Sequence, residues 1–331
     1  MKIIYLKPKS SFRNNLRSDT LWGLLCWGIN NIFGESKLKD FINSYNEGGN
    51  VLKVSSAFPY INVNGKRNLY FPKPILKPID INNYLDFYKI TSKSNRSQVI
   101  SKLKSFKKVK YINENAFFDL LNGRITEYEL FTNTQIWDNN DINVSIKSVD
   151  IMHNTINRLT NTTLEGNLYI DSEIFAKNAG LFFLLDGSID QINMVTAALR
   201  FYSHIGFGGD AAIGKGYFDI QIEDYNLTIN KNANSFITLS LYSPVQNETI
   251  EFKKHPNLCW YELETRKGKY GGQHIKDTNF WKDSVLMFKE GSVFPNLNKT
   301  NYGINKIVKR TSYFDVVNFG YAFNLPFVKE C

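Results

Sequence analysis

Residues 206–216 constrain this chain most, because five of these eleven residues are glycine and a single lysine, Lys215, stands near the end. Glycine adopts positive φ and lets the backbone approach a ligand closely, which residues with a Cβ tolerate poorly. Successive free N–H groups in such a loop form a concave site for anions. Three interpretations compete: a nucleotide-binding P-loop, a metal-binding Gly-Gly-Asp turn, and a loop that holds a nucleic-acid backbone.

The residues around the loop fit neither catalytic interpretation. Residues 209–215 have the Gly-x-x-x-x-Gly-Lys spacing of a P-loop, but Gly216 stands where a hydroxyl must bind magnesium. The loop also follows an expected helix and precedes an expected strand, whereas a P-loop has the reverse order. Asp210 is followed by two alanines, so one carboxylate stands alone where a divalent metal needs more charge. A glycine-rich connection without a ligand stays open as an alternative.

Composition limits the class of protein. The 331 residues are 43% hydrophobic and 15% aromatic, enough for a large core and about two domains. The formal charge of +9 favours an anionic partner, nucleic acid before membrane. Three distant cysteines without a Cys-x-x-Cys pair predict neither disulfides nor a zinc site, and they favour a cytoplasmic setting. No apolar stretch is long enough for a signal peptide or a membrane helix, so we expect no membrane association.

Hydrophobic spacing predicts an α+β chain. After an initial strand, a basic loop leads to an amphipathic helix for which Ser18 and Asp19 are N-cap candidates. Ser188 caps a later helix that runs into the glycine loop, and an alternating strand follows. Two ferredoxin-like halves are the simplest architecture that fits this order. We expect an N-terminal domain at residues 1–150 and a C-terminal domain, with the glycine loop, at residues 151–331.

Residues 123–150 are polar, asparagine-rich and short on periodicity. Such a segment predicts extended pieces rather than helices. We therefore expect a protruding hairpin here, at the join between the two halves.

Residues 89–110 carry eight basic residues and no acidic one. Val99, Leu103 and Phe106 have the spacing of the apolar stripe of a helix. The basic face of that helix is either solvated or in contact with phosphate, and the sequence leaves both interpretations open.

Candidate catalytic groups are few, whereas basic loops are common. None of the four histidines has metal-ligand spacing, and His153, beside the polar Asn154 and Arg158, is the best candidate for acid–base chemistry.

Basic loops with aromatic residues recur, and the first contains Arg13 and Arg17. Lys and Arg neutralise phosphates while exposed rings stack on unpaired bases, which is how single-stranded RNA is usually held. These patterns favour RNA.

A series of short segments also resembles a known family. The segments are Ser-Asp-Thr-Leu-Trp-Gly at 18–23, Ser-Ser-Ala-Phe-Pro at 55–59, Phe-Pro-Lys-Pro at 71–74, His-Asn at 153–154 with Arg-Leu at 158–159, the glycine loop, Gly-Ser-Val-Phe at 291–294 and the ending at 319–326. In this order they resemble a RAMP-superfamily protein of CRISPR systems, and most of all the fourth subunit of the type III-A (Csm) effector complex. The matches cover nearly the whole chain, and their order is more specific than any one of them.

The resemblance implies two RRM-like ferredoxin folds and a scaffold without catalytic activity, metal or cofactor. Its members hold the repeat-derived 5′ handle of the guide RNA (crRNA), dock on the large palm-domain subunit and begin the backbone filament of the third, RAMP subunit. By position, residues 123–150 would be the family's thumb insertion. Together with Arg13 and Arg17 of the basic loop, the residues expected to contact RNA are Ser18, Asp19, His153, Asn154, Arg158, Gly206, Phe207, Gly208, Gly209 and Lys215.

Two alternatives stay open. The first is a metal-independent crRNA-processing endoribonuclease of the same superfamily, with His153 or His204 as general acid or base. The second is a related RAMP subunit from another CRISPR subtype, which differs only in its partners.

Overall fold

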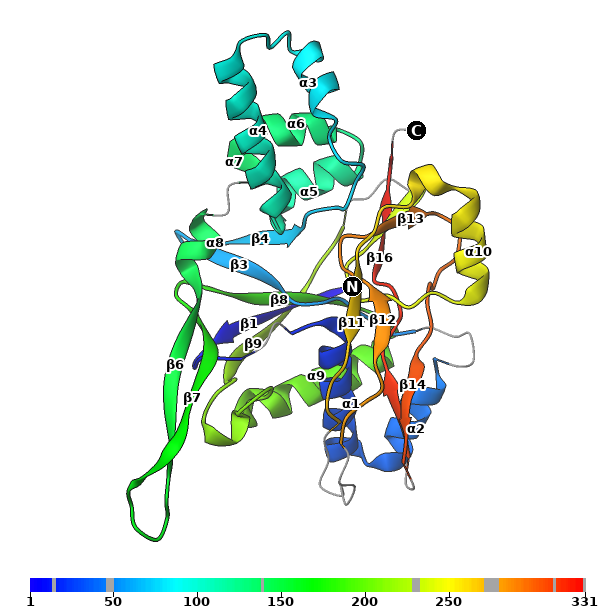
Figure 1. Cartoon of the computed structure of the whole chain (residues 1–331). Helices are drawn as coiled ribbons and strands as arrows, with labels where there is room; N and C mark the ends of the chain where they lie inside the picture. Colours follow the sequence, from blue (N-terminus) through cyan, green and yellow to red (C-terminus); the bar gives the residue numbers. More distant parts are fainter. Residues whose placement is uncertain are drawn as a thin grey trace.

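The computed structural model describes residues 1–13, 16–45, 51–137, 140–227, 233–270, 280–311 and 314–329. It combines helices with antiparallel sheets (Figure 1), so the α+β prediction is confirmed. In the described part of the chain, no helix has the length and apolar character needed to cross a membrane.

The centre of the fold is an antiparallel sheet with the strand order β5-β4-β3-β8-β1-β9, and β2 pairs with β8 beside it. The strands are β1 (Lys2–Pro8), β2 (Lys53–Val54), β3 (Phe58–Val63), β4 (Lys66–Pro72), β5 (Tyr111–Asn113), β8 (Ala179–Asp186) and β9 (Phe218–Asp224). Both faces of β1 are buried, with Ile4 and Leu6 on one face and Ile3 and Tyr5 on the other.

Two long helices cover one face of this sheet (Figure 1). Helix α1 (Ser18–Phe33) and helix α9 (Ile189–Ile205) confirm the two helices expected beside the basic loop and the glycine loop. Ser188 and Gln191 form the capping box of α9, with the Gln191 N–H donating to Ser188 Oγ at 3.3 Å. The order β1-α1-β3-β8-α9-β9, with β1 between β8 and β9, is a ferredoxin-like arrangement.

The sheets divide the chain differently from the expected boundary after residue 150. Strand β1 pairs with β8 and β9, so the first ferredoxin-like unit needs residues from both sides of that boundary and extends to Asp224. Periodicity could identify these strands but could not show which of them pair, because pairing depends on contacts between distant segments.

The chain after residue 233 forms a smaller antiparallel unit. Strand β10 (Ser235–Thr238) lies between β13 (Val293–Pro295) and β16 (Asn324–Phe327), as the first strand of a ferredoxin-like fold lies between the third and fourth. Helix α10 (Gln246–Lys254) follows β10, but a hairpin stands where a second helix would follow β13. The two hairpins of this unit are β11 (Leu263–Arg266) with β12 (Val285–Phe288), and β14 (Lys306–Arg310) with β15 (Asp315–Asn318).

A helical insert follows β4, and within it β5 pairs with β4 at the edge of the sheet. Its helices are α3 (Ile81–Phe87), α4 (Lys93–Lys108), α5 (Glu114–Leu121), α6 (Glu127–Thr132), α7 (Thr134–Trp137) and α8 (Asn140–Ser145). The extended pieces expected within residues 123–150 are therefore wrong for most of that segment. A capping box between Thr126 and Glu129 begins α6, and this local signal outweighs the weak periodicity.

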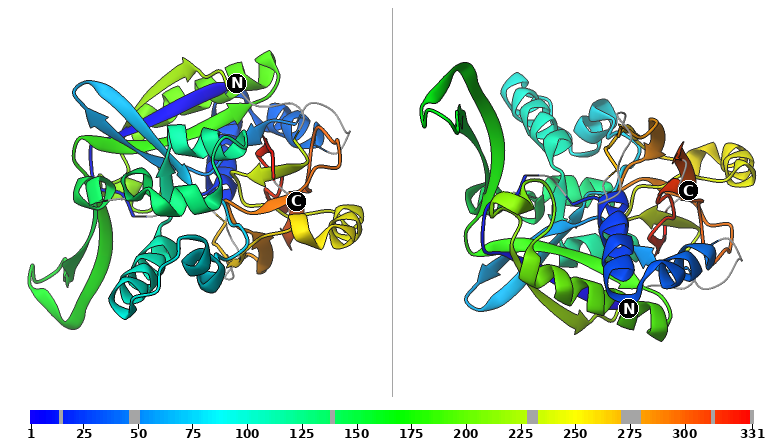
Figure 2. Two further views of the ribbon diagram at one scale, coloured as in Figure 1. Left: turned by 90° about the horizontal axis from the view of Figure 1, so that it is seen from above. Right: turned by 90° about the horizontal axis from the view of Figure 1, so that it is seen from below.

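The protruding hairpin lies later than predicted. It consists of β6 (Ile146–Ile156) and β7 (Thr163–Ala176), so only its first residues fall within the expected segment 123–150. Figure 2 shows that this hairpin and the helical insert both extend well beyond the body of the molecule.

Close packing of α1 on α9 gives a first prediction. A Cβ placed on Gly28 of α1 would lie 2.6 Å from Ala198 Cβ and 2.9 Å from Tyr202 Cε2. Gly28→Leu should therefore lower the free energy of unfolding by about 1–3 kcal/mol in urea denaturation. Gly23→Ala on the same helix is the control, because no atom lies within 4 Å of its added Cβ, and it should leave the protein at least as stable. Unchanged stability of Gly28→Leu would contradict the packing.

Candidate nucleic-acid interface

The glycine loop is closed at its base and open at its tip. The Phe207 N–H donates to the Gly216 carbonyl at 3.0 Å, and the Gly216 N–H donates to the Ser11 carbonyl at 2.8 Å. A Cβ on Gly216 would lie 2.0 Å from the Phe207 carbonyl oxygen, so the base needs glycine for packing. Gly208 and Gly214 also have positive φ, but a Cβ on either would meet nothing within 4 Å. A purely structural role thus accounts for the packing at the base, whereas the open tip leaves room for a ligand.

Carboxylates hold the basic groups around this loop. Arg13 Nη1 lies 2.5 Å from Asp210 Oδ2, and Arg13 also pairs with Asp171 of β7. Lys215 pairs with Glu173 of β7, whose side chain is only 4% exposed. The structure thus places Arg13 and Lys215 beside the loop, and both side chains have carboxylate counter-ions.

Glu173 joins the hairpin β6-β7 to the glycine loop. It accepts a hydrogen bond from Ser11 Oγ at 2.5 Å, and its Oε1 lies 3.4 Å from His153 Nε2. His153 also stacks on Tyr169 with ring centres 5.3 Å apart. The sequence analysis missed Glu173, because only the pairing of β6 with β7 and their packing on the loop place it there.

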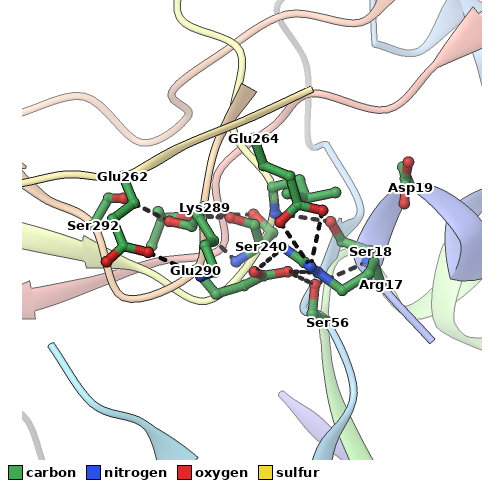
Figure 3. A network of polar contacts seen from close by, with 12 residues as sticks. Arg17, Ser18, Asp19, Ser56, Ser240, Glu262, Glu264, Lys289, Glu290 and Ser292 are labelled. Carbon is green, nitrogen blue, oxygen red and sulfur yellow. Dashed lines mark hydrogen bonds and ion pairs between the residues drawn. The ribbon is translucent and has the colours of Figure 1, made fainter. Parts of the chain in front are cut away.

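Arg17 lies in a second network, at the contact between the two units (Figure 3). Its Nε donates to Glu290 Oε1 at 2.6 Å, and its Nη1 donates to Glu264 Oε2 at 3.0 Å. Burial alone would lower the pKa of Arg17, but these two carboxylates raise it above its usual value. Ser56 Oγ also donates to Glu290, so this arginine ties the start of α1 to the C-terminal unit.

Ser18 and Asp19 are not the helix caps that the sequence predicts. The N-cap of α1 is Arg17, without a side-chain cap. Ser18 Oγ instead accepts a hydrogen bond from the Leu241 N–H at 2.9 Å, and Asp19 pairs with Arg266 at 3.0 Å. Tertiary partners in the C-terminal unit have displaced the local capping bonds.

A groove of about 1280 Å³ connects two of the predicted clusters. It runs along α1 and α2 (Glu35–Asn43), and both Asp19 and Gly208 line it. Trp27 and Phe314, which are 37% and 45% exposed, supply rings to its wall. Asn154 and Arg158, by contrast, are exposed on the hairpin β6-β7 and its connecting turn and do not line this groove.

Lys282 gives the groove a cation that the sequence analysis did not single out. Burial lowers the pKa of Lys282, and the carboxylate of Asp19 opposes that shift. In the described part of the chain, no group forms an ion pair or hydrogen bond with its ammonium. At the rim, Lys269 Nζ lies 4.9 Å from the centre of the Trp281 ring. The groove therefore combines basic side chains with aromatic surface, and four carboxylates line it as well, those of Asp19, Glu35, Asp283 and Asp315.

Within the described ranges, no group of three or more His, Cys, Asp or Glu side chains could hold a metal ion. Cys26 and Cys259 are free thiols. The side chains gathered at the loop and the groove are mainly charged and aromatic.

The burial of Arg17 between carboxylates leads to a second prediction, which concerns the stability of the protein. Arg17→Met should lower the free energy of unfolding by on the order of 3 kcal/mol, because Glu290, 7% exposed, would lose its cation. Arg158→Met on the exposed turn is the control and should change stability by less than about 0.5 kcal/mol. Denaturant unfolding of the full chain measures both, and equal values for the two variants would contradict a structural role for Arg17.

Double-mutant cycles test the link between hairpin and loop. For Lys215→Met and Glu173→Gln we expect a coupling energy of about 1–3 kcal/mol, because the pair is largely buried. The exposed pair Lys254–Glu251 of α10, at 2.7 Å, is the control and should give less than about 0.5 kcal/mol. A coupling no larger than that of the control would mean that the pair does not anchor the hairpin.

Comparisons with known proteins agree with this geometry. Residues 231–327 match the family model of the CRISPR Csm4 C-terminal domain. The chain is 24% identical over 250 residues to a protein of Thermococcus onnurineus (strain NA1) described as CRISPR system Cms protein Csm4, and the match covers 75% of this chain and 76% of the relative.

Solved structures share the fold over the whole chain. A chain of a Csm3-Csm4 subcomplex in the type III-A CRISPR-Cas interference complex matches with a TM-score of 0.64 and 17% identity, covering 99% of this chain and 100% of that one. A chain of a Csm1-Csm4 cassette in complex with cA4 matches with a TM-score of 0.62 and 19% identity, covering 100% and 99%. Residues 231–327 thus match the CRISPR Csm4 C-terminal domain and the chain as a whole is similar to Csm4 proteins, which confirms the resemblance inferred from its sequence.

Proposed function

We propose that this chain is a non-catalytic RNA-binding scaffold of a type III-A CRISPR interference complex, and that it holds the 5′ handle of the crRNA. The observation that carries the proposal is the groove along α1, which Gly208, Asp19 and Lys282 all line. The handle would lie in this groove with the glycine loop at one end.

The chemistry of the groove suits a short single strand. The ammonium of Lys282 has no carboxylate bound to it in the described part of the chain, so it can neutralise a phosphate without displacing a partner. The rings of Trp27 and Phe314 offer surfaces on which unpaired bases can stack. At Gly208 the backbone is open, because no atom lies within 4 Å of the position of a Cβ.

The proposed partners follow from the related assemblies. Similar chains occur in a Csm1-Csm4 cassette and in a Csm3-Csm4 subcomplex. We infer that this chain likewise joins the large palm-domain subunit to the third subunit, which forms the backbone of the complex.

The surroundings of His153 support a role without catalysis. A general acid or base must come within hydrogen-bond reach of the RNA. His153 Nε2 is buried, and it lies beside Glu173 and under the Tyr169 ring. In the part of the chain that the structure describes, the exposed His204 at the end of α9 pairs with no carboxylate that could orient it for such chemistry.

Substitutions at two glycines with similar φ values test whether the groove holds the handle. Gly208 and Gly214 have φ values of 94° and 90° and equally open surroundings, but only Gly208 lines the groove. In the reconstituted complex, Gly208→Val should weaken binding of handle-bearing crRNA by at least about tenfold, a loss of about 1.4 kcal/mol. Gly214→Val should bind like the wild type. Equal affinities for the two variants, each checked for normal folding, would reject the groove as the handle site.

Two further measurements accompany this comparison. Lys282→Gln should reduce the slope of log affinity against log salt by about 0.7, the value for one phosphate contact on a single strand.

Incubation of the protein with repeat RNA in EDTA tests the scaffold role, since specific cleavage that disappears in His153→Ala or His204→Ala would identify an endoribonuclease instead.

A further inference from the structure

Helix α4 carries basic residues and no acidic one, and it does not line the groove along α1. Its apolar side is buried in the insert, where Leu103 and Phe106 are 9% and 2% exposed. The helix predicted from Val99, Leu103 and Phe106 is thus confirmed, and its opposite side faces solvent.

The cations of α4 form one stripe. At 3.6 residues per turn, positions 93, 104 and 108 lie on the same side of the helix, and positions 96 and 107 flank them. All five residues are exposed. They are Lys93, Arg96, Lys104, Lys107 and Lys108. The rise of 1.5 Å per residue gives the stripe a length of about 22 Å.

No carboxylate neutralises this stripe. Among the residues that the structure describes, none of these five cations takes part in an ion pair. Lys102 turns to the flank instead, where it donates to the Thr132 carbonyl at 2.7 Å and lies over the Phe131 ring. Like charges three or four residues apart repel each other on a helix, and nothing within α4 offsets this repulsion. An external polyanion would offset it.

Small polar residues lie beside the stripe. Ser97 and Ser101 are exposed next to Lys104 and Lys108, so a flat anionic strand can approach the helix closely and accept hydrogen bonds from the hydroxyls. No acidic side chain occurs from residue 89 to residue 110, so no negative charge within this segment repels a phosphate. Lys107 and Lys108, at the C-terminal end of the stripe, also line a pocket of about 900 Å³, together with Glu127. The regular row of cations along the helix fits a backbone of repeating charges.

The stripe is separate from the proposed handle site. The insert lies beside β4 and β5, at one edge of the central sheet, whereas the glycine loop leads into β9 at the other edge (Figure 1). We propose that the exposed face of α4 is a second, sequence-independent contact for the phosphate backbone of a single-stranded nucleic acid outside the 5′ handle. This surface binds phosphate whether the strand comes from the rest of the guide or from another RNA.

Neutralising the stripe tests the proposal. The variant Lys93→Gln/Lys104→Gln/Lys108→Gln removes three exposed charges and should fold normally. Its binding to a labelled oligouridine without a handle should weaken, and the slope of log affinity against log salt should fall by about 2. The control is Lys177→Gln/Lys253→Gln/Lys306→Gln, which loses the same charge from exposed positions elsewhere. It should keep the wild-type slope.

Further binding measurements distinguish the α4 stripe from the proposed handle site. The α4 variant should still bind an isolated handle RNA, and Lys282→Gln should still bind oligouridine. An equal loss in both triple variants, or no loss in the α4 variant, would overturn the proposal. So would an α4 variant that binds RNA normally but no longer assembles with its protein partners, because the stripe would then recognise an acidic protein. Within the complex, crosslinking to guide or to added RNA identifies the source of the strand.

Discussion

The pairing of β1 with β8 and β9 is the constraint on which the rest of the structure depends. Backbone hydrogen bonds hold the first strand between two strands from the middle of the chain. This pairing brings together the basic loop after β1, the hairpin before β8 and the glycine loop before β9. The Gly216 N–H donates to the Ser11 carbonyl, and Glu173 binds both Ser11 and Lys215. The candidate interface is therefore a consequence of strand order.

The electrostatic environment divides the cations into two groups. Arg13, Arg17 and Lys215 are held by carboxylates, so a phosphate that bound them would have to displace buried acids such as Glu173 or Glu290. Such displacement leaves a buried charge without a partner, which is costly. Lys282 and the exposed cations of α4 carry no such penalty. An anionic strand thus has more to gain at the groove and the stripe than at the cations closest to the glycine loop.

The local signals in the sequence predicted much of the fold. The capping box at Ser188, the apolar spacing in α4 and the glycines after α9 depend on neighbouring residues, and each marked the expected element. The same kind of signal at Thr126 and Glu129 was present but overlooked, because the asparagine-rich composition of the segment suggested extended structure. Of the expected site residues, Arg13 pairs with Asp210 of the glycine loop and Lys215 belongs to that loop. His153 contacts Glu173 of β7, whereas Arg17 and Ser18 lie at the contact between the units.

By itself, the sequence determined helices α1, α4 and α9, the glycine loop and the excess of positive charge, because these depend on residues close together in the chain. Only the tertiary structure decided which strands pair, where the hairpin protrudes and which carboxylate meets each cation. It also formed the groove in which Asp19, Gly208 and Lys282 lie together, although they are far apart in the chain. The physical reason is that pairing and ion-pair formation select among distant segments by their combined burial and geometry, and no local pattern encodes that choice.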